Sequence, residues 1–429
     1  MAVTKLIGLR ETKPKPMATT CGSPADEVRR GETVASPWRP SVMPRRHLKL
    51  RAVCSLLIFF LTGASHASED RECPNPSPKC VGTATWTWLD TDMAAGVAES
   101  DVDDGYALLY VLNSPELDLR GVSIVFGNHN DMDAQVAITE HILAEFGPGR
   151  GPVAATTIQA YPGAQSPEDL LSDVPTPAVL GMKAAAEAAA EAGTKLVVLA
   201  VGTLTNVAHL YRLFPASAAG ISEVVVVAGR RPGQRFTTGT VNELGHPDLN
   251  FELDTRAFRE LLGSPLPLTY LPFEITSQVS LTEADLEAVK NAPGASAAGA
   301  WVHTVGLPWL GLWRRVFGVD GFHPFDCLAA IRVTHPGLVH CEGLLSWVQE
   351  LPDDKTDPRV KGKGDATKLF LLAAPADVAA RATGGKGAPP PRPVLFCFHA
   401  EGAGGGSGGL KDLLLARLAG GGGTAERRR

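Results

Sequence analysis

The sequence predicts an α/β fold: an open, mainly parallel, doubly wound sheet in a single large domain. Two observations predict it. From residue 83 onward, short apolar runs alternate with helical stretches, as expected when each strand is followed by a crossover helix. Most of these runs are continuously apolar, which is typical of strands covered on both faces. With 429 residues, 44% of them hydrophobic, the chain has enough apolar material for such a domain.

The expected elements follow in chain order. Strands are predicted over residues 83–91, 119–126, 195–201, 223–228, 267–273 and 393–398. Helices are predicted over residues 103–113, 133–146, 180–192, 205–214, 255–262, 282–291 and 326–333. In an open parallel sheet, ligands bind beyond the carboxyl ends of the strands. The residues that follow each strand are therefore the first candidates for a functional site.

The beginning of the chain is predicted to direct the protein to the secretory pathway. Residues 1–42 are either an untranslated upstream extension or a separate targeting segment, because Met43 would start a signal peptide of normal length over residues 43–67. Its apolar run, residues 52–62, is too short to span a bilayer, so we expect no stable membrane anchor. In the linker, residues 68–82, Cys73 and Cys80 either form a disulfide or remain surface thiols.

The domain is predicted to cover residues 83–400, and the Gly-rich residues 401–429 to form a solvated tail. Ser407 lies in a match to the hydrolase motif G-x-S-x-G, but a glycine run matches such motifs by composition, and the motif needs a tight strand-to-helix turn. The net charge of −6 provides no positive field for a nucleic acid polymer. A glycan-binding module is disfavoured, because only 6% of the residues are aromatic.

The most informative stretch is residues 88–130, which contains a cluster of carboxylates. Asp90 and Asp92 end the first predicted strand, and Asp103 and Asp104 begin the next helix. Like charges that share a site raise each other's pKa unless a cation or a proton offsets them. Carboxylate oxygens suit Ca²⁺ or Mg²⁺ better than zinc. Two interpretations stay open: a metal site, or a solvated loop before a helix start that favours acidic residues.

This stretch resembles the opening of the nucleoside hydrolase family, the inosine-uridine-preferring type that splits N-ribosyl bonds with a bound Ca²⁺. Asp-x-Asp, Asp-Asp at a helix start and an apolar strand that ends in Gly-Asn carry the resemblance. Further similar segments follow at residues 201–208 (VGTLTNVA), 223–229, 248–254 (DLNFELD) and 323–329 (HPFDCLA). Together they cover residues 83–350 in the family's order, which is more specific than any single motif.

The resemblance implies a Ca²⁺ site and a ribose site. It implies that Asp92 both contacts the metal and activates water. The other implied metal ligands are Asp104, the main-chain carbonyl of Thr205, and Asp326. The implied ribose ligands are Asp103, Asn128, Asn242, Asp248 and Asn250. Asp248 stands where the family usually has glutamate, which keeps an acceptor but shortens it by one methylene.

Two departures from the family pattern concern the first loop and the leaving base. Residues 93–102 form a longer insert than the usual D-P-G-x-D-D loop. Phe325 stands where many members have a histidine that serves the base. His323 is therefore either the acid that protonates the leaving base or an ordinary loop histidine. Phe325 either packs on the base or belongs to the core.

The expected function is that of a secreted, Ca²⁺-dependent hydrolase that cleaves nucleosides to ribose and free base. Asp92 would act as general base toward water, and positive charge would build on the sugar ring, as in other glycosidases. The alternative is an extracellular ribose- or nucleoside-binding protein that has lost turnover. Asp92 favours the enzyme, because a binding protein needs no water-activating base. The expected partner is a small-molecule nucleoside, and the sequence is compatible with a homo-oligomer.

Overall fold

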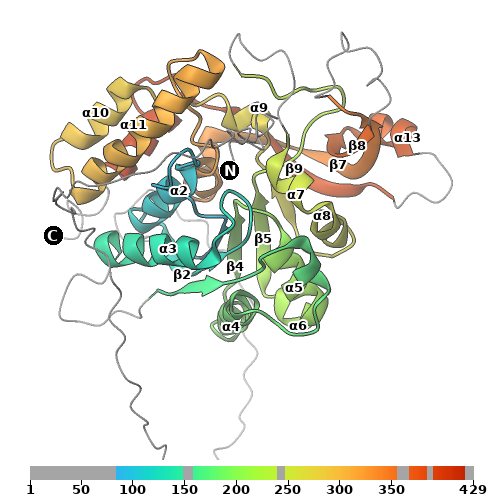
Figure 1. Ribbon diagram of the computed structural model, residues 1–429. Coiled ribbons are helices and arrows are strands. Elements are labelled where there is room, and N and C mark those ends of the chain that lie inside the picture. Colours follow the sequence, from blue (N-terminus) through green and yellow to red (C-terminus); the bar gives the residue numbers. More distant parts are fainter. Residues whose placement is uncertain (1–83, 148–157, 239–246, 355–366, 384–389, 421–429) are drawn as a thin grey trace, which may run out of the picture. The chain divides into compact units, whose positions relative to one another are not determined.

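The computed structural model describes residues 84–147, 158–238, 247–354, 367–383 and 390–420 (Figure 1). The predicted signal peptide, the cysteines at positions 73 and 80, and Asn242 lie outside the described residues. No helix within the described ranges has the length and apolarity needed to cross a membrane.

The described strands form one sheet in the order β3-β2-β1-β4-β5-β6-β9-β7-β8. Their bounds are β1 (Thr85–Thr91), β2 (Leu117–Ile124), β3 (Ala160–Pro162), β4 (Leu196–Ala200), β5 (Ile221–Val226), β6 (Leu268–Tyr270), β7 (Val339–Pro352), β8 (Thr367–Ala374) and β9 (Arg392–Ala400). Pairing is parallel from β3 to β9, whereas β7 pairs antiparallel with β9 and β8. The prediction of an open, mainly parallel, doubly wound sheet in a single domain is confirmed.

The strand order identifies the place where a ligand is expected. From β1 the chain first extends the sheet through β2 and β3, and then returns to the other side of β1 with β4 and β5. The crossovers beside β1 and β4 therefore leave in opposite directions, and a crevice opens at the carboxyl ends of these two strands.

Helices cover both faces of the sheet (Figure 1). Their bounds are α2 (Asp103–Leu112), α3 (Met132–Phe146), α4 (Pro177–Glu191), α5 (Thr205–Leu213), α6 (Pro215–Ala218), α7 (Leu249–Leu253), α8 (Thr255–Leu262), α9 (Phe273–Thr276), α10 (Glu283–Asn291), α11 (Ala297–Phe317), α12 (Cys327–Thr334), α13 (Ala376–Thr383) and α14 (Leu410–Leu418). Neighbouring residues of β1 point to opposite faces: Leu89 packs with α2, α11, α12 and α14, and Trp88 packs with α4, α5 and α8.

Side-chain caps explain where several of these helices begin. Asp131 accepts a hydrogen bond from the Ala134 amide at the start of α3. Thr176 caps α4, which has Pro177 in its first turn, where a missing N–H costs nothing. Before α10, Thr282 takes part in a reciprocal capping box.

The structure differs from the expected tail at its C-terminal end. Residues Leu410–Leu418 form helix α14, and Leu410, Leu414 and Leu418 are buried against the core on the α2 side of the sheet. Leucines four residues apart give a helix one apolar stripe. Burial of this stripe stabilises the helix although the neighbouring residues are rich in glycine. Ser407 lies in an exposed turn before this helix, so it does not form a hydrolase elbow.

Candidate active site

Four aspartates meet at the carboxyl edge of the sheet, beside β1. We call Asp92, Asp103, Asp104 and Asp326 the acid cluster. Asp92 follows β1, Asp103 and Asp104 begin α2, and Asp326 immediately precedes α12. All four are buried, and carboxylate oxygens of Asp103, Asp104 and Asp326 lie within 4.8 Å of one another. Carboxylates separated by 222 residues of sequence are thus brought to one point by the fold.

Asn128, just after β2, holds two members of the acid cluster. Its backbone N–H donates to Asp92 Oδ2 at 2.7 Å, and its side-chain amide donates to Asp104 Oδ2 at 3.0 Å. The preceding residue must be glycine, because a Cβ at Gly127 would lie 1.9 Å from Asp92 Oδ2. The Gly-Asn pair at the end of this strand therefore sets the position of the first aspartate.

Two more hydrogen bonds connect the cluster to its surroundings. The Thr91 hydroxyl donates to Asp104, and the Asp326 backbone N–H donates to Asp103 Oδ2 at 3.3 Å. The second bond joins the starts of α2 and α12, so both helices present their first carboxylate to the same volume.

The acid cluster is short of positive charge. Burial is the main reason why the pKa of Asp92, Asp103 and Asp326 is raised well above the ordinary value, and neighbouring carboxylates raise it further. Burial also raises the pKa of Asp104, against the hydrogen bonds that it accepts from Thr91 and Asn128. Protons or a cation are needed to offset this charge. The donors are all carboxylate oxygens, so the set fits a hard divalent cation.

The insert between β1 and α2 adds one more carboxylate to the cavity. Asp101 accepts hydrogen bonds from the backbone N–H groups of Val102 and Asp103, at 2.7 and 3.3 Å, and lines the cavity. Burial raises its pKa to about 6. Glu99, two residues earlier, is exposed and forms an ion pair with Arg315. The longer insert thus adds Asp101 to the site and leaves Glu99 on the surface.

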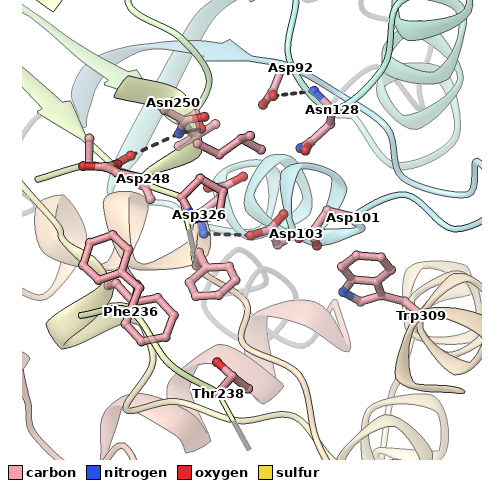
Figure 2. Close-up of a pocket in the computed structure, with 18 of the residues that line it drawn as sticks. Asp92, Asp101, Asp103, Asn128, Phe236, Thr238, Asp248, Asn250, Trp309 and Asp326 are labelled. Carbon is pink, nitrogen blue, oxygen red and sulfur yellow. Dashed lines mark hydrogen bonds between the residues drawn. The ribbon is translucent and has the colours of Figure 1, made fainter. Parts of the chain in front are cut away.

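A second group of polar side chains lines the cavity from the start of α7, where it bonds to the backbone that follows β4 and β5. Asp248 precedes α7 and accepts a hydrogen bond from the Gly229 N–H at 2.8 Å, while burial raises its pKa to about 6. Asn250 donates to the carbonyl oxygens of Val201 and Val227, at 2.7 and 3.0 Å. Figure 2 shows Asp248 and Asn250 near Asp92 and Asn128, with the acidic residues Asp101, Asp103 and Asp326 nearby.

Aromatic side chains line another part of the cavity. We call six lining residues the aromatic wall: Phe236, Phe273, Trp309, Trp313, Phe317 and Phe325. Phe236 and Phe273 stack at 4.8 Å between ring centroids, and Trp313 lies 6.3 Å from both Trp309 and Phe325. The cavity therefore has a carboxylate and amide end for a polar, hydroxyl-bearing group, and an aromatic end for a flat ring.

A family model supports what this geometry suggests. The model described as inosine-uridine preferring nucleoside hydrolase matches residues 87–381, which is more than half of the chain. The chain belongs to the nucleoside hydrolase family. The family predicted from the sequence motifs is therefore confirmed.

Curated relatives and solved structures agree with this membership. Uridine nucleosidase 1 of Arabidopsis thaliana is 27% identical over 208 residues, 45% of this chain and 60% of the relative. A probable uridine nucleosidase 1 of Oryza sativa subsp. japonica is 25% identical over 46% of this chain and 63% of the relative. The chain thus spans less than two thirds of both curated relatives. A plant nucleoside hydrolase structure, 20% identical, matches with a TM-score of 0.57 over 79% of this chain and 99% of its own, and so shares the fold.

Most of the site residues predicted by the nucleoside hydrolase resemblance line the cavity: Asp92, Asp103, Asn128, Asp248, Asn250, Phe325 and Asp326. Asp104 lies next to them, bonded to Asn128. Their roles toward a metal or a nucleoside stay predictions.

Thr205 and His323 are placed differently from the other predicted site residues. The Thr205 hydroxyl donates to Asp254 at 2.6 Å, and Thr205 is not among the lining residues, whereas Val201, at the end of β4, is. His323 also does not line the cavity. Its Nδ1 donates to the Val279 carbonyl at 2.7 Å, and burial lowers its pKa. A neutral imidazole held in this way has no proton on Nε2 to give, so the structure favours the loop-histidine interpretation.

The sequence prediction missed the three residues of the aromatic wall that lie on α11. Trp309, Trp313 and Phe317 are spaced four residues apart, which places them on one face of a helix. That spacing is readable in the sequence WLGLWRRVF, but it does not tell whether the stripe faces the core or a ligand.

Proposed function

We propose that this chain is a secreted, Ca²⁺-dependent hydrolase that cleaves the N-ribosyl bond of nucleosides. The observation that supports the proposal best is the two-ended cavity, with the acid cluster and Asn128 at one end and the aromatic wall at the other. A nucleoside has matching ends, a ribose with vicinal hydroxyls and a flat base. Its N-glycosidic bond would then lie between them.

The acid cluster would hold the cation. Asp103, Asp104 and Asp326 supply buried oxygen donors within 4.8 Å of one another, and Asp92 lies beside them. The carbonyl of Val201, which lines the cavity, is a better candidate for a main-chain ligand than that of Thr205. A bound Ca²⁺ would supply positive charge that keeps these carboxylates ionised, and oxygen coordination that orients the ribose hydroxyls.

Asp92 would take the proton from the attacking water. The Asn128 N–H positions its carboxylate through the 2.7 Å hydrogen bond and stabilises the ionised form. As the carbon–nitrogen bond breaks, its electron pair moves to the base, and the sugar ring becomes positively charged. The surrounding carboxylates stabilise that charge, and the water oxygen bonds to the anomeric carbon while Asp92 accepts the proton.

The leaving base would be stabilised by the indoles of α11. Trp309 and Trp313 are buried and line the cavity, and their Nε1–H groups have no hydrogen-bond partner among the described residues. Figure 2 shows Trp309 on the opposite side of the view from Asp248. A buried donor without a partner costs free energy, which an acceptor atom of the base would recover. An indole N–H does not release its proton, so it would stabilise the departing base by hydrogen bonding alone.

Secretion is supported by the sequence before residue 68 and by a disulfide in the sheet. Cys341 on β7 and Cys397 on β9 are bonded, and disulfides persist mainly in oxidising compartments. Both features support the proposal that the protein enters the secretory pathway.

The test is release of free ribose from a panel of purine and pyrimidine nucleosides by the purified secreted chain, with Ca²⁺ and with a calcium chelator. We expect release that the chelator abolishes and added Ca²⁺ restores. A chain that binds a nucleoside by calorimetry but releases no ribose from any of them would instead be the nucleoside-binding protein.

A further inference from the structure

Three side chains at the start of β7 and the end of β9 form a cluster that the active site does not use. His340 on β7, His399 on β9 and Glu401 just after β9 place one ligating atom each within 4.8 Å of one another, and all three are exposed. We propose that they bind a late first-row transition metal ion, of which Zn²⁺ is the representative, at a site separate from the acid cluster. This inference does not depend on the proposed hydrolase activity.

The strand register brings the two histidines to the same side of the sheet. His340 pairs with His399, whereas Cys341 pairs with Cys397, so Phe398 is one extra residue on β9. Such a bulge changes which residues of the two strands lie opposite each other, and here His340 lies opposite His399. The imidazole rings stack, with centroids 5.5 Å apart and planes 25° apart. Both Nε2 atoms lie near the same carboxylate oxygen of Glu401.

Glu401 supplies this carboxylate at a distance typical of metal ligands. Its Oε2 lies 3.5 Å from His340 Nε2 and 3.7 Å from His399 Nε2, which is longer than an ordinary hydrogen bond. Two ligands bound at about 2.1 Å in a tetrahedral site are separated by roughly 3.4 Å. Each of these two nitrogen–oxygen distances is thus close to the spacing of two ligands around one zinc ion, and side-chain rotations would bring the three atoms around it.

The backbone around the cluster is held in place by several bonds. The Cys341–Cys397 disulfide joins the two strands next to His340 on β7 and two residues before His399 on β9. The Glu401 N–H donates to the Leu338 carbonyl at 2.9 Å, and its carbonyl accepts from the Leu410 N–H at 2.9 Å. A fixed backbone lowers the entropy cost of bringing three ligands together. A metal here would tie β7 and β9 to the segment that leads into α14.

The donor set points to the zinc class of metals. Two imidazole nitrogens and one carboxylate suit Zn²⁺, Cu²⁺ or Ni²⁺, whereas Ca²⁺ and Mg²⁺ prefer oxygen ligands. Three protein ligands leave the fourth position to water, as in open zinc sites. The imidazole side chains are 48% and 52% exposed, so a metal ion can reach them from solution.

The test is calorimetric titration of the full, non-reduced chain with Zn²⁺, Ni²⁺ and Cu²⁺, in excess Ca²⁺ to keep the acid cluster filled. We expect one binding event per chain that His399→Ala and Glu401→Gln weaken by at least about tenfold, and that the double variant His340→Ala/His399→Ala loses. His141→Ala, which changes an exposed histidine on α3, is the matched control and should bind like the parent.

Bound Co²⁺ gives a second measurement, because its visible absorption reports tetrahedral coordination. The parent should develop that absorption, and the double variant should not. The proposal is overturned if the double variant keeps the binding event, if His141→Ala loses it as well, or if the parent binds none of the three metals.

Discussion

Replacing Asp326 by asparagine should stabilise the metal-free protein while removing most of its stabilisation by Ca²⁺. Asparagine has nearly the same shape, but it carries no charge. Asp326 is buried, and the carboxylates of Asp104, Asp92 and Asp101 raise its pKa further. The variant therefore relieves a like-charge contact in the absence of metal and removes a ligand in its presence.

The size of both effects can be bounded. The metal-free fold can avoid a buried negative charge by keeping the carboxyl protonated. At pH 7, protonating a carboxyl with an unfolded pKa near 3.9 costs about 1.4 kcal/mol per pH unit of difference, which is about 4 kcal/mol and sets the upper limit of the penalty. The metal-free variant should gain no more than that. For the parent, Ca²⁺ at 100 times its Kd adds about 2.7 kcal/mol. If losing one carboxylate weakens binding about 100-fold, the same Ca²⁺ adds only about 0.4 kcal/mol to the variant.

Thermal melting with and without Ca²⁺, together with calorimetric titration, measures both quantities. The melting temperature of Asp326→Asn should lie above that of the parent in chelator and rise little when Ca²⁺ is added. Asp320→Asn is a matched control, because Asp320 is an exposed partner of Arg314. It should keep the full rise. An equal rise for the parent and Asp326→Asn would show that Asp326 does not hold the metal.

Four further predictions concern catalysis, pH and processing. Asp92→Asn should lower turnover by about two to four orders of magnitude in excess Ca²⁺, with a much smaller loss of nucleoside affinity by calorimetry; ribose release at the parent rate would exclude Asp92 as the base. Trp309→Phe should lower kcat/KM for nucleosides by roughly tenfold, the value of one buried hydrogen bond, whereas Trp347→Phe, whose indole donates to a glutamine instead, should not. Because the folded-state pKa values of Asp103 and other carboxyls of the acid cluster are raised, the metal-free fold binds more protons than the unfolded chain. Its stability should therefore fall as pH rises above about 4 and through those raised values, and the gain in melting temperature on adding Ca²⁺ should be larger at pH 8 than at pH 5; equal gains would argue against a carboxylate site. Peptide mapping of secreted protein should find the mature N-terminus near Ser68, and peptides from residues 1–42 in that material would contradict the signal peptide.

Much of the acid cluster could be predicted from the sequence, because its residues directly follow strands or begin helices. Asp92 ends an apolar run, Asp103 begins a helical pattern, and Asn128 follows the next apolar run. In a parallel sheet those positions meet at one edge whatever the details of packing. The alternation of apolar runs and helices likewise predicted strands β1, β2, β4, β5, β6 and β9, but not the short edge strand β3 and not the order of the strands in the sheet.

The antiparallel part of the sheet was not predicted. Strand β7 mixes buried and exposed residues and lacks the continuous apolar run of the central strands. Strand β8 does contain an apolar run, residues 369–374, but it directly follows a stretch rich in charged residues. The pairing of Cys341 with Cys397, and of His340 with His399, depends on this register. Sequence spacing alone contains no information about it.

The direction of side chains beyond the strand ends also depended on the tertiary structure. The helix α11 contains Pro308, a residue that removes a backbone donor and usually argues against a helix interior. Its packing over the cavity turns the stripe of Trp309 and Trp313 toward the site. Val201 lines the cavity while Thr205, four residues later, bonds to Asp254, which lies between α7 and α8.

By itself, the sequence determined the family, the parallel core and the carboxylates that follow its strands, because these depend on local periodicity and on residues at element ends. Only the tertiary structure decided what faces those carboxylates across the cavity. That side is built by α11 and by the residues before α7, which are far away in the sequence. Contacts between such distant segments come from the packing of whole helices on the sheet, and local residue patterns do not specify them.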